Sequence, residues 1–119
     1  FLHNGKQSNL NNVVSSRKII SGSWDNSIKL WEFGKEEPIL SIQAHSQYVS
    51  CLALIEHNVF ASSSWDKTIK FWSFPELKCI HTIEAHNQAV RGLIKVNSEE
   101  IASCGMDCLI KVWNIKTCI

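Results

Sequence analysis

Short apolar runs separated by polar turns about every ten residues make up most of the chain. Within runs such as residues 27–31, apolar and polar side chains alternate, which is typical of a β-strand with one buried face. No segment sustains the 3.6-residue apolar period of an amphipathic helix. Strands are predicted at residues 10–14, 18–21, 27–31, 39–42, 48–55, 59–64, 69–72, 79–83, 90–96 and 101–103, with 48–55 buried on both faces.

An eleven-residue phrase occurs three times at equal spacing. It reads SGSWDNSIKLW from Ser21, SSSWDKTIKFW from Ser62 and SCGMDCLIKVW from Ser103, so that each copy begins 41 residues after the previous one. A fixed period of about 40 residues indicates a repeat architecture in which each unit is one supersecondary element. The chain is therefore predicted to be all-β, with four-stranded antiparallel meanders at residues 1–42 and 43–83 and an incomplete third at 84–119.

Four side chains keep fixed offsets within the repeat. Ser lies four residues before the turn Asp, Trp six after it and His 21 before it. The carboxylate accepts an imidazole N–H, the imidazole accepts the serine hydroxyl, and the serine oxygen accepts the indole N–H, so four buried groups satisfy one another. The predicted sets are His45–Ser62–Asp66–Trp72, His86–Ser103–Asp107–Trp113 and the partial set Ser21–Asp25–Trp31, where Asn4 stands at the histidine position and His3 precedes it.

These residues resemble the WD40 repeat family, from Arg17 to the end of the chain and more weakly before it. Family members fold as β-propellers with four-stranded blades. The resemblance therefore implies propeller blades, in which the four-residue sets are structural tetrads. Three blades are fewer than the roughly four to eight of a closed propeller, and the chain starts at Phe1 without Met, so a fragment of a larger propeller is expected.

The sequence departs from the family pattern beside the turns. The Asp of the dipeptide that names the family is replaced by Glu32, Ser73 and Asn114. If the residue after the turn Asp needs a positive φ, Asn tolerates that conformation best and other side chains less well. The family has Gly at this position, and this chain has Asn26, Lys67 and Cys108.

The Ser62, His45 and Asp66 group has the composition of a catalytic triad. A triad is recognised by geometry and roles at one cleft, whereas this group recurs with each repeat. A structural role is therefore favoured, and the chain is predicted not to be an enzyme and to need no cofactor.

Five cysteines, an odd number, are scattered through the chain. This pattern predicts reduced thiols in a cytoplasmic or nuclear protein. Cys104 and Cys108, with His81 or His86, are candidate zinc ligands, but only two thiols are close and the other repeats have no Cys there. No metal site is predicted.

Trp24 and Trp65 directly precede the turn Asp of their repeats. One interpretation is that each indole packs against a neighbouring loop. By the resemblance, however, this position faces the narrow top surface where family members bind partners. Aromatic and Arg side chains gathered on one surface have the composition of a binding hot spot. The predicted partner-binding set is Trp24, Tyr48, Ser50, Trp65, Arg91 and Met106.

The expected function is a non-enzymatic scaffold that binds a protein or peptide on the propeller top face within a multiprotein complex. The formal net charge of +1 argues against direct nucleic-acid binding. No apolar run of about 18 residues predicts a membrane span. Three isolated lysines, Lys29, Lys70 and Lys111, are expected to extend to solvent at a blade edge.

Two alternative functions stay open. The runs ISGSWD, WDKTIKFW and VRGL resemble phospholipase-activating, ubiquitin-binding propellers that serve a protein-unfolding ATPase, which implies a ubiquitin-binding adaptor of protein degradation. The other alternative is the propeller domain of an enzyme or of an RNA-associated assembly factor.

Overall fold

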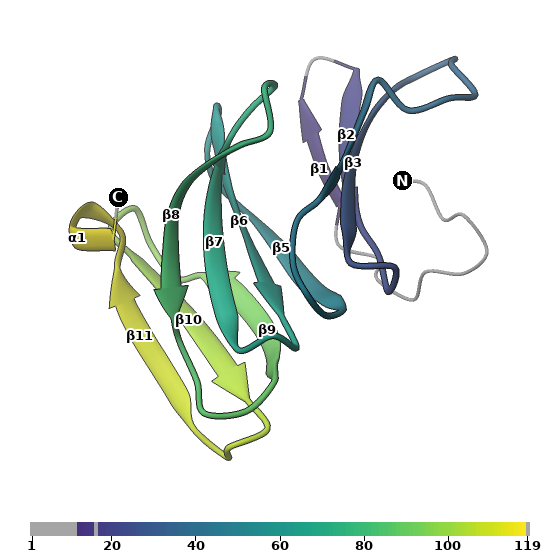
Figure 1. The fold of residues 1–119 in the computed structure, drawn as a ribbon. Helices are drawn as coiled ribbons and strands as arrows, with labels where there is room; N and C mark the ends of the chain where they lie inside the picture. Colours follow the sequence, from purple (N-terminus) through teal and green to yellow (C-terminus); the bar gives the residue numbers. More distant parts are fainter. Residues whose placement is uncertain (1–11, 16, 119) are drawn as a thin grey trace.

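The fold consists of three antiparallel sheets that lie one after another along the chain (Figure 1). A computed structural model describes residues 12–15 and 17–118. The first sheet contains β1 (Asn12–Ser15), β2 (Lys18–Gly22), β3 (Ser27–Glu32) and β4 (Leu40–Gln43). The second contains β5 (Val49–Glu56), β6 (Val59–Ser64), β7 (Thr68–Ser73) and β8 (Lys78–Glu84). The third contains β9 (Val90–Lys95), β10 (Glu100–Gly105) and β11 (Ile110–Asn114), followed by α1 (Ile115–Cys118).

Each sheet is a meander, because strands that are consecutive in the sequence are neighbours in the sheet. The same register recurs with the sequence repeat: Ser21 pairs with Lys29, Ser62 with Lys70, and Ser103 with Lys111. These pairs sit at matching places in the repeated phrase. The period in the sequence is therefore a period in strand pairing, and the predicted all-β fold of antiparallel meanders is confirmed.

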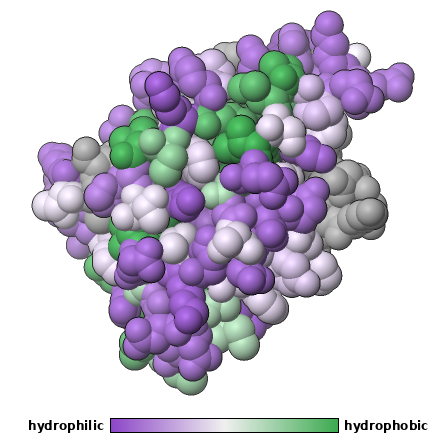
Figure 2. All heavy atoms as spheres, in the orientation of Figure 1, coloured by the Kyte–Doolittle hydropathy of each residue, from purple (hydrophilic) through white to green (hydrophobic). Residues whose placement is uncertain are grey.

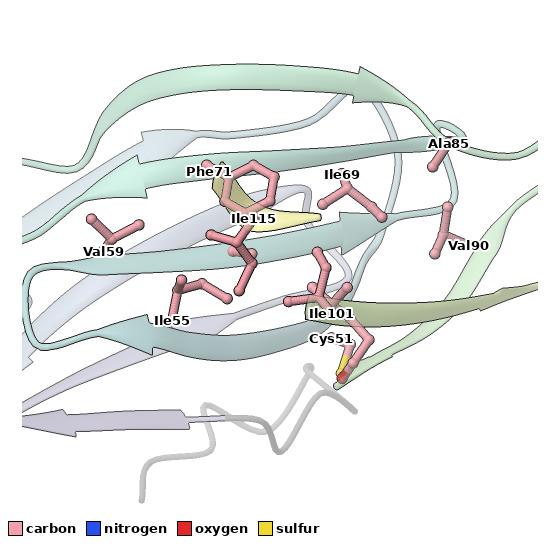
Figure 3. Packing of buried hydrophobic residues seen from close by; sticks show 11 residues of the cluster. Cys51, Ile55, Val59, Ile69, Phe71, Ala85, Val90, Ile101 and Ile115 are labelled. Atoms are coloured by element: carbon pink, nitrogen blue, oxygen red, sulfur yellow. The ribbon is translucent and has the colours of Figure 1, made fainter. Parts of the chain in front are cut away.

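The hydrophobic core lies between neighbouring sheets. One cluster joins the first sheet to the second, with Ile28 and Leu30 packed near Phe60 and Trp72. The other joins the second sheet to the third, and Figure 3 shows its side chains, such as Phe71 and Ile101, converging between the strands. Stability therefore comes from sheet stacked on sheet, as expected for units that cannot bury an apolar face alone.

The third sheet presents an apolar face that none of the described residues covers. Ile110 is 77% exposed, whereas its counterparts one and two repeats earlier, Ile69 and Ile28, are fully buried between sheets. Val112 is likewise exposed although its counterpart Phe71 is buried. This face has the character of a surface on which a further blade stacks, which fits a fragment of a larger propeller. Figure 2 shows the molecule in the orientation of Figure 1, and the visible side is mostly hydrophilic with a few hydrophobic patches.

The strand at residues 48–55 differs from its prediction. The structure places Tyr48 before β5, and Leu54 within it is 43% exposed, so the strand is not buried on both faces. β5 is the first strand of its sheet, and neither neighbouring sheet covers Leu54 near its end. Of the predicted strand at 10–14, residues 10 and 11 lie outside the described residues.

The short helix α1 was not predicted, because a four-residue helix is too short to show a period. Its first turn is capped by Asn114, whose side-chain oxygen accepts hydrogen bonds from the backbone N–H groups of Lys116 and Thr117 at 2.9 and 3.2 Å. No described helix is long and apolar enough to cross a membrane.

Candidate functional site

The turn between the second and third strands of each sheet is shaped by its aspartate. Asp66 Oδ1 accepts the backbone N–H of Thr68 at 3.0 Å and the Thr68 hydroxyl at 2.6 Å. Asp25 bonds Ser27 in the same way, and Asp107 Oδ1 accepts the backbone N–H of Leu109. A carboxylate that bonds the chain two residues on is a common way to close a tight turn.

The residue after each of these aspartates has a left-handed backbone. The φ values are 74° at Asn26, 79° at Lys67 and 69° at Cys108. This conformation is the one that glycine adopts without cost and other residues adopt rarely. The chain therefore keeps the backbone shape of the family turn while carrying side chains that strain it, least so at Asn26.

In the second repeat the four predicted side chains are joined in one buried hydrogen-bond chain. His45 Nδ1 donates to Asp66 Oδ2 at 2.8 Å, and His45 Nε2 lies 2.7 Å from Ser62 Oγ. Trp72 Nε1 donates to the same oxygen at 2.8 Å. The Asp66 carboxylate can only accept, so Nδ1 is the donor to it; in the tautomer with its proton on Nδ1, Nε2 accepts from the Ser62 hydroxyl while the Ser62 oxygen accepts the Trp72 N–H.

The third repeat forms the same hydrogen-bond chain, but its imidazole contacts both oxygens of its aspartate. His86 Nδ1 lies 3.0 Å from both Asp107 oxygens, while Ser103 Oγ binds His86 Nε2 and Trp113 Nε1 at 2.9 Å each. In the first repeat Trp31 Nε1 donates to Ser21 Oγ at 2.9 Å. Asn4 and His3, the candidates for its histidine position, lie outside the described residues.

Gly105 leaves room for the His86 imidazole in this arrangement. A Cβ placed on Gly105 would lie 2.6 Å from His86 Nδ1 and 2.8 Å from Asp107 Oδ1. The second repeat has Ser64 at this place, and its hydroxyl accepts the backbone N–H of Asp66 at 3.0 Å. The two turns therefore share a backbone but pack their histidines differently, and no motif in the sequence points to the role of Gly105.

Burial alone would raise the pKa of Asp66, but hydrogen bonds from His45 and Thr68 and the attraction of His45 outweigh it and hold that pKa well below the usual range. At Asp107 the effect of burial is likewise outweighed by bonds from His86 and the backbone, so its pKa is also lowered. Both carboxylates therefore stay ionised as acceptors for the imidazole N–H at neutral pH.

This hydrogen-bond chain is arranged to hold the blade together. Ser62 is fully buried and its oxygen already accepts the Trp72 indole, so it is not placed to meet a substrate. Cys104 and Cys108 are free and exposed, and no three described His, Cys, Asp or Glu side chains gather as a metal site. The geometry favours structure over catalysis.

Two of the repeated lysines do not extend to solvent as expected. Lys70 Nζ donates to the Ala44 carbonyl at 3.1 Å, and Lys111 Nζ donates to the Ala85 carbonyl at 2.8 Å. Each bond reaches the residue before the tetrad histidine, where the carbonyl needs a partner. The recurrence of Lys at one position of the phrase was the available indication of this role.

Three aromatic rings form a row across the first and second sheets. The Trp24 and Tyr48 rings are stacked, with centroids 5.2 Å apart and planes 11° from parallel. Tyr48 also contacts Trp65, with ring centroids 5.1 Å apart and planes tilted by 47°. Trp24 is 50% exposed and Trp65 40% exposed, so the row presents its rings to solvent beside the turns. We call the surface at turns 23–26, 64–67 and 105–108 the turn face.

The other residues of the predicted partner-binding set have separate environments. Met106 is 46% exposed at the third turn, and its backbone N–H donates to the Ala89 carbonyl. Arg91 is exposed in β9. Ser50 is half-buried, and its hydroxyl lies 2.9 Å from Ser63 Oγ and donates to the Val90 carbonyl at 2.7 Å. Ser50 thus links the second and third sheets, which leaves its hydroxyl engaged inside the protein.

The architecture and the hydrogen-bonded turns define the chain as a segment of a β-propeller repeat protein. The family model for the WD domain, G-beta repeat, matches residues 3–32, 36–73 and 77–114. The chain belongs to the WD40 repeat family.

Solved structures of two WD40-type chains are similar to this one. The WD40 β-propeller domain of Doa1 matches 91% of the chain with 34% identity and a TM-score of 0.74. U3-55K matches 99% of the chain with 26% identity and a TM-score of 0.82. An uncharacterized WD repeat-containing protein of Schizosaccharomyces pombe is 42% identical over 40 residues, or 34% of this chain. The chain covers 36%, 38% and 11% of the lengths of these three relatives, respectively.

Proposed function

We propose that this WD40 segment binds a partner protein or peptide on its turn face and acts as a non-enzymatic interaction scaffold. The observation that carries the proposal is the exposed row of Trp24, Tyr48 and Trp65. WD40 propeller domains commonly mediate protein–protein interactions, and the turn face of this chain carries two substantially exposed tryptophans, Trp24 and Trp65.

The geometry of the row supports binding. Tryptophan and tyrosine supply large contact areas and are enriched among the residues that dominate interface energies. Tyr48 contacts the rings of both Trp24 and Trp65, so the rings are held in place before a partner arrives. A pre-ordered surface loses less side-chain entropy on association, which favours affinity.

The test is capture of partners by purified protein in which Trp24 and Trp65 are changed to alanine. We expect Trp24→Ala and Trp65→Ala to weaken partner binding by at least about tenfold, because truncating an interface hot spot costs roughly 2 kcal/mol or more. The melting temperature should change little, since both side chains are substantially exposed.

The matched control is Ile80→Ala, which removes an apolar side chain of similar exposure from the outer strand β8. It should leave partner binding intact. A sharp fall in melting temperature for the Trp variants, with partner binding unchanged, would show that the rings serve the fold.

Ubiquitin is the second candidate partner, supported by the resemblance of the repeated phrases to ubiquitin-binding propellers. Immobilised ubiquitin should retain the native protein and lose the Trp24→Ala/Trp65→Ala variant. Lack of retention of the native protein removes this candidate and leaves the general proposal standing. Binding to RNA with a strong salt dependence would instead favour the RNA-associated alternative.

A further inference from the structure

The row of side chains on the turn face is interrupted at one position. Because the repeat is 41 residues long, Trp65 and Ala89 correspond to Trp24 and Tyr48, and Met106 corresponds to Trp65. Where Tyr48 stacks on Trp24, the next repeat has only the methyl group of Ala89. The third repeat therefore has no ring of its own at the place, beside Trp65, that Tyr48 fills beside Trp24.

The backbone is the same at both places, so the difference comes from the side chain. The Tyr48 carbonyl accepts a hydrogen bond from the backbone N–H of Trp65 at 3.0 Å, and the Ala89 carbonyl accepts one from the backbone N–H of Met106 at 2.8 Å. The residues after the two turn aspartates, Lys67 and Cys108, also share a left-handed φ. The third repeat thus reproduces the frame that holds Tyr48 and leaves out the ring.

We propose that the place between Trp65 and Met106 binds an aromatic side chain of the partner protein, which stacks on Trp65 as Tyr48 stacks on Trp24. This inference rests on the proposed function and specifies the chemistry of its partner. Trp65 is 40% exposed and Met106 46% exposed, so both walls are accessible. An indole face and a methionine thioether both make favourable contacts with aromatic rings.

A cation beside this place further defines the partner. Arg91 lies two residues after Ala89 and is exposed. Two residues of chain span at most roughly 7 Å, so the long Arg91 side chain begins close to this place. A carboxylate next to the partner's aromatic residue complements Arg91, so the fitting segment is a tyrosine or another aromatic residue flanked by acidic residues.

The experiment uses the acetylated, amidated tripeptide Asp-Tyr-Asp as the probe and Asp-Ala-Asp as its control. Binding is followed by the NMR shifts of the indole N–H groups of Trp24 and Trp65, assigned with Trp→Phe variants. In the native protein we expect Asp-Tyr-Asp to shift the Trp65 signal most, and Asp-Ala-Asp to bind roughly 2- to 12-fold more weakly, the range expected for one aromatic contact.

Two opposite substitutions, Ala89→Tyr and Tyr48→Ala, test whether a missing ring creates the binding place. Ala89→Tyr should fill the place from within and remove the probe-induced Trp65 shift, whereas Gln88→Tyr, a control that adds the same ring one residue away, should not. Tyr48→Ala should open the matching place beside Trp24 and add a Trp24 shift. Arg91→Gln should weaken binding about 2- to 5-fold, as expected for one exposed charge.

The proposal is overturned if the probe leaves Trp65 unshifted in the native protein, or if Asp-Ala-Asp binds equally well. It is also overturned if Ala89→Tyr folds and binds the probe as before. If Ala89→Tyr does not fold, the proposal is overturned when Tyr48→Ala shows no new Trp24 shift. Loss of partner capture in Trp65→Ala but not in Ala89→Tyr would retain the proposed function and reject this inference. Probe binding at Trp65 combined with unchanged partner capture in both Trp variants would reject the proposed function instead.

Discussion

At the scale of the residue, the aspartate of a repeated turn can make both local and long-range hydrogen bonds. Asp66 closes its turn through Thr68 and also accepts the His45 N–H, so one carboxylate links local and long-range structure. The His45 and Ser62 side chains are buried, so they cannot hydrogen-bond to water instead. Leaving one such group unpaired costs roughly 1–3 kcal/mol, which is why the offsets recur so strictly.

The lowered pKa of Asp66 predicts an acid-dependent loss of stability. Its pKa in the folded protein lies below the unfolded value of about 3.9, so the unfolded chain binds more protons in this range and stability rises with pH. The contribution is full above the unfolded pKa and is lost as the pH falls through about 4 and below. Urea unfolding from pH 7 to pH 3 should show this decline.

The variant Asp66→Asn should have a shallower acid decline because the titrating charge is gone. It should also be about 1–3 kcal/mol less stable at pH 7, since the His45 N–H then faces a neutral acceptor. Part of the loss of stability at low pH should remain in this variant, because the pKa values of Asp25 and Asp107 are also lowered. An unchanged pH profile in Asp66→Asn would assign the acid sensitivity to other groups.

The packing of Gly105 predicts that a side chain is harmful there. Gly105→Ser should destabilise the protein by about 1–3 kcal/mol, because the new Cβ would lie 2.6 Å from His86 Nδ1 and force the imidazole away from Asp107. The midpoint of urea unfolding measures the loss. Ser64→Gly is the reciprocal control: it removes two hydrogen bonds, with the Asp66 backbone N–H and the Gln47 carbonyl, but introduces no clash, so the imidazole is not displaced. Equal midpoints for native protein and Gly105→Ser would mean that the histidine moves freely.

At the scale of the element, hydrogen bonds between neighbouring sheets supplement the apolar contacts. Lys70 on β7 reaches the Ala44 carbonyl just after β4, and Ser50 on β5 reaches the Val90 carbonyl in β9. Both bonds satisfy backbone oxygens at strand ends, where the sheet ladder has finished. They hold adjacent blades in a defined register.

Removal of the lysine bond should therefore loosen the contact between the first two sheets. Lys70→Met keeps a long apolar side chain but cannot donate, so we expect a loss of about 0.5–1.5 kcal/mol in the free energy of unfolding. Lys78→Met, at an exposed position of β8, is the matched control and should have little effect. A loss of the same size in both variants would mean that the Ala44 bond contributes nothing particular.

At the scale of the whole molecule, stacking of like units determines which surfaces are buried. Equivalent residues such as Ile28, Ile69 and Ile110 share one place in the repeat, yet the first two are fully buried and the third is exposed. The difference lies only in whether a sheet follows. The exposed face and the partial coverage of the solved relatives both fit a fragment of a larger propeller.

Much of the fold could be read from the sequence because its information is local and repeated. Alternating residues define the strands, polar pairs define the turns, and three copies of one phrase define equal units. The bonding partners of Ser62 and Trp72 followed from fixed offsets for the same reason. The helix α1 and the exposure of Leu54 could not be predicted, since a single turn has no period and burial depends on the neighbouring sheet.

What the sequence by itself determined is the unit: its strands, its turn and the side chains that hydrogen-bond within it, all set by short-range spacing. The tertiary structure alone decided what happens between units, because those contacts depend on how neighbouring sheets pack against one another. It stacked Trp24 on Tyr48 and directed Lys70 to the Ala44 carbonyl just after β4. Trp24 and Trp65 were visible as unusual residues in the sequence, but their joining through Tyr48 into one exposed row depends on how two blades pack.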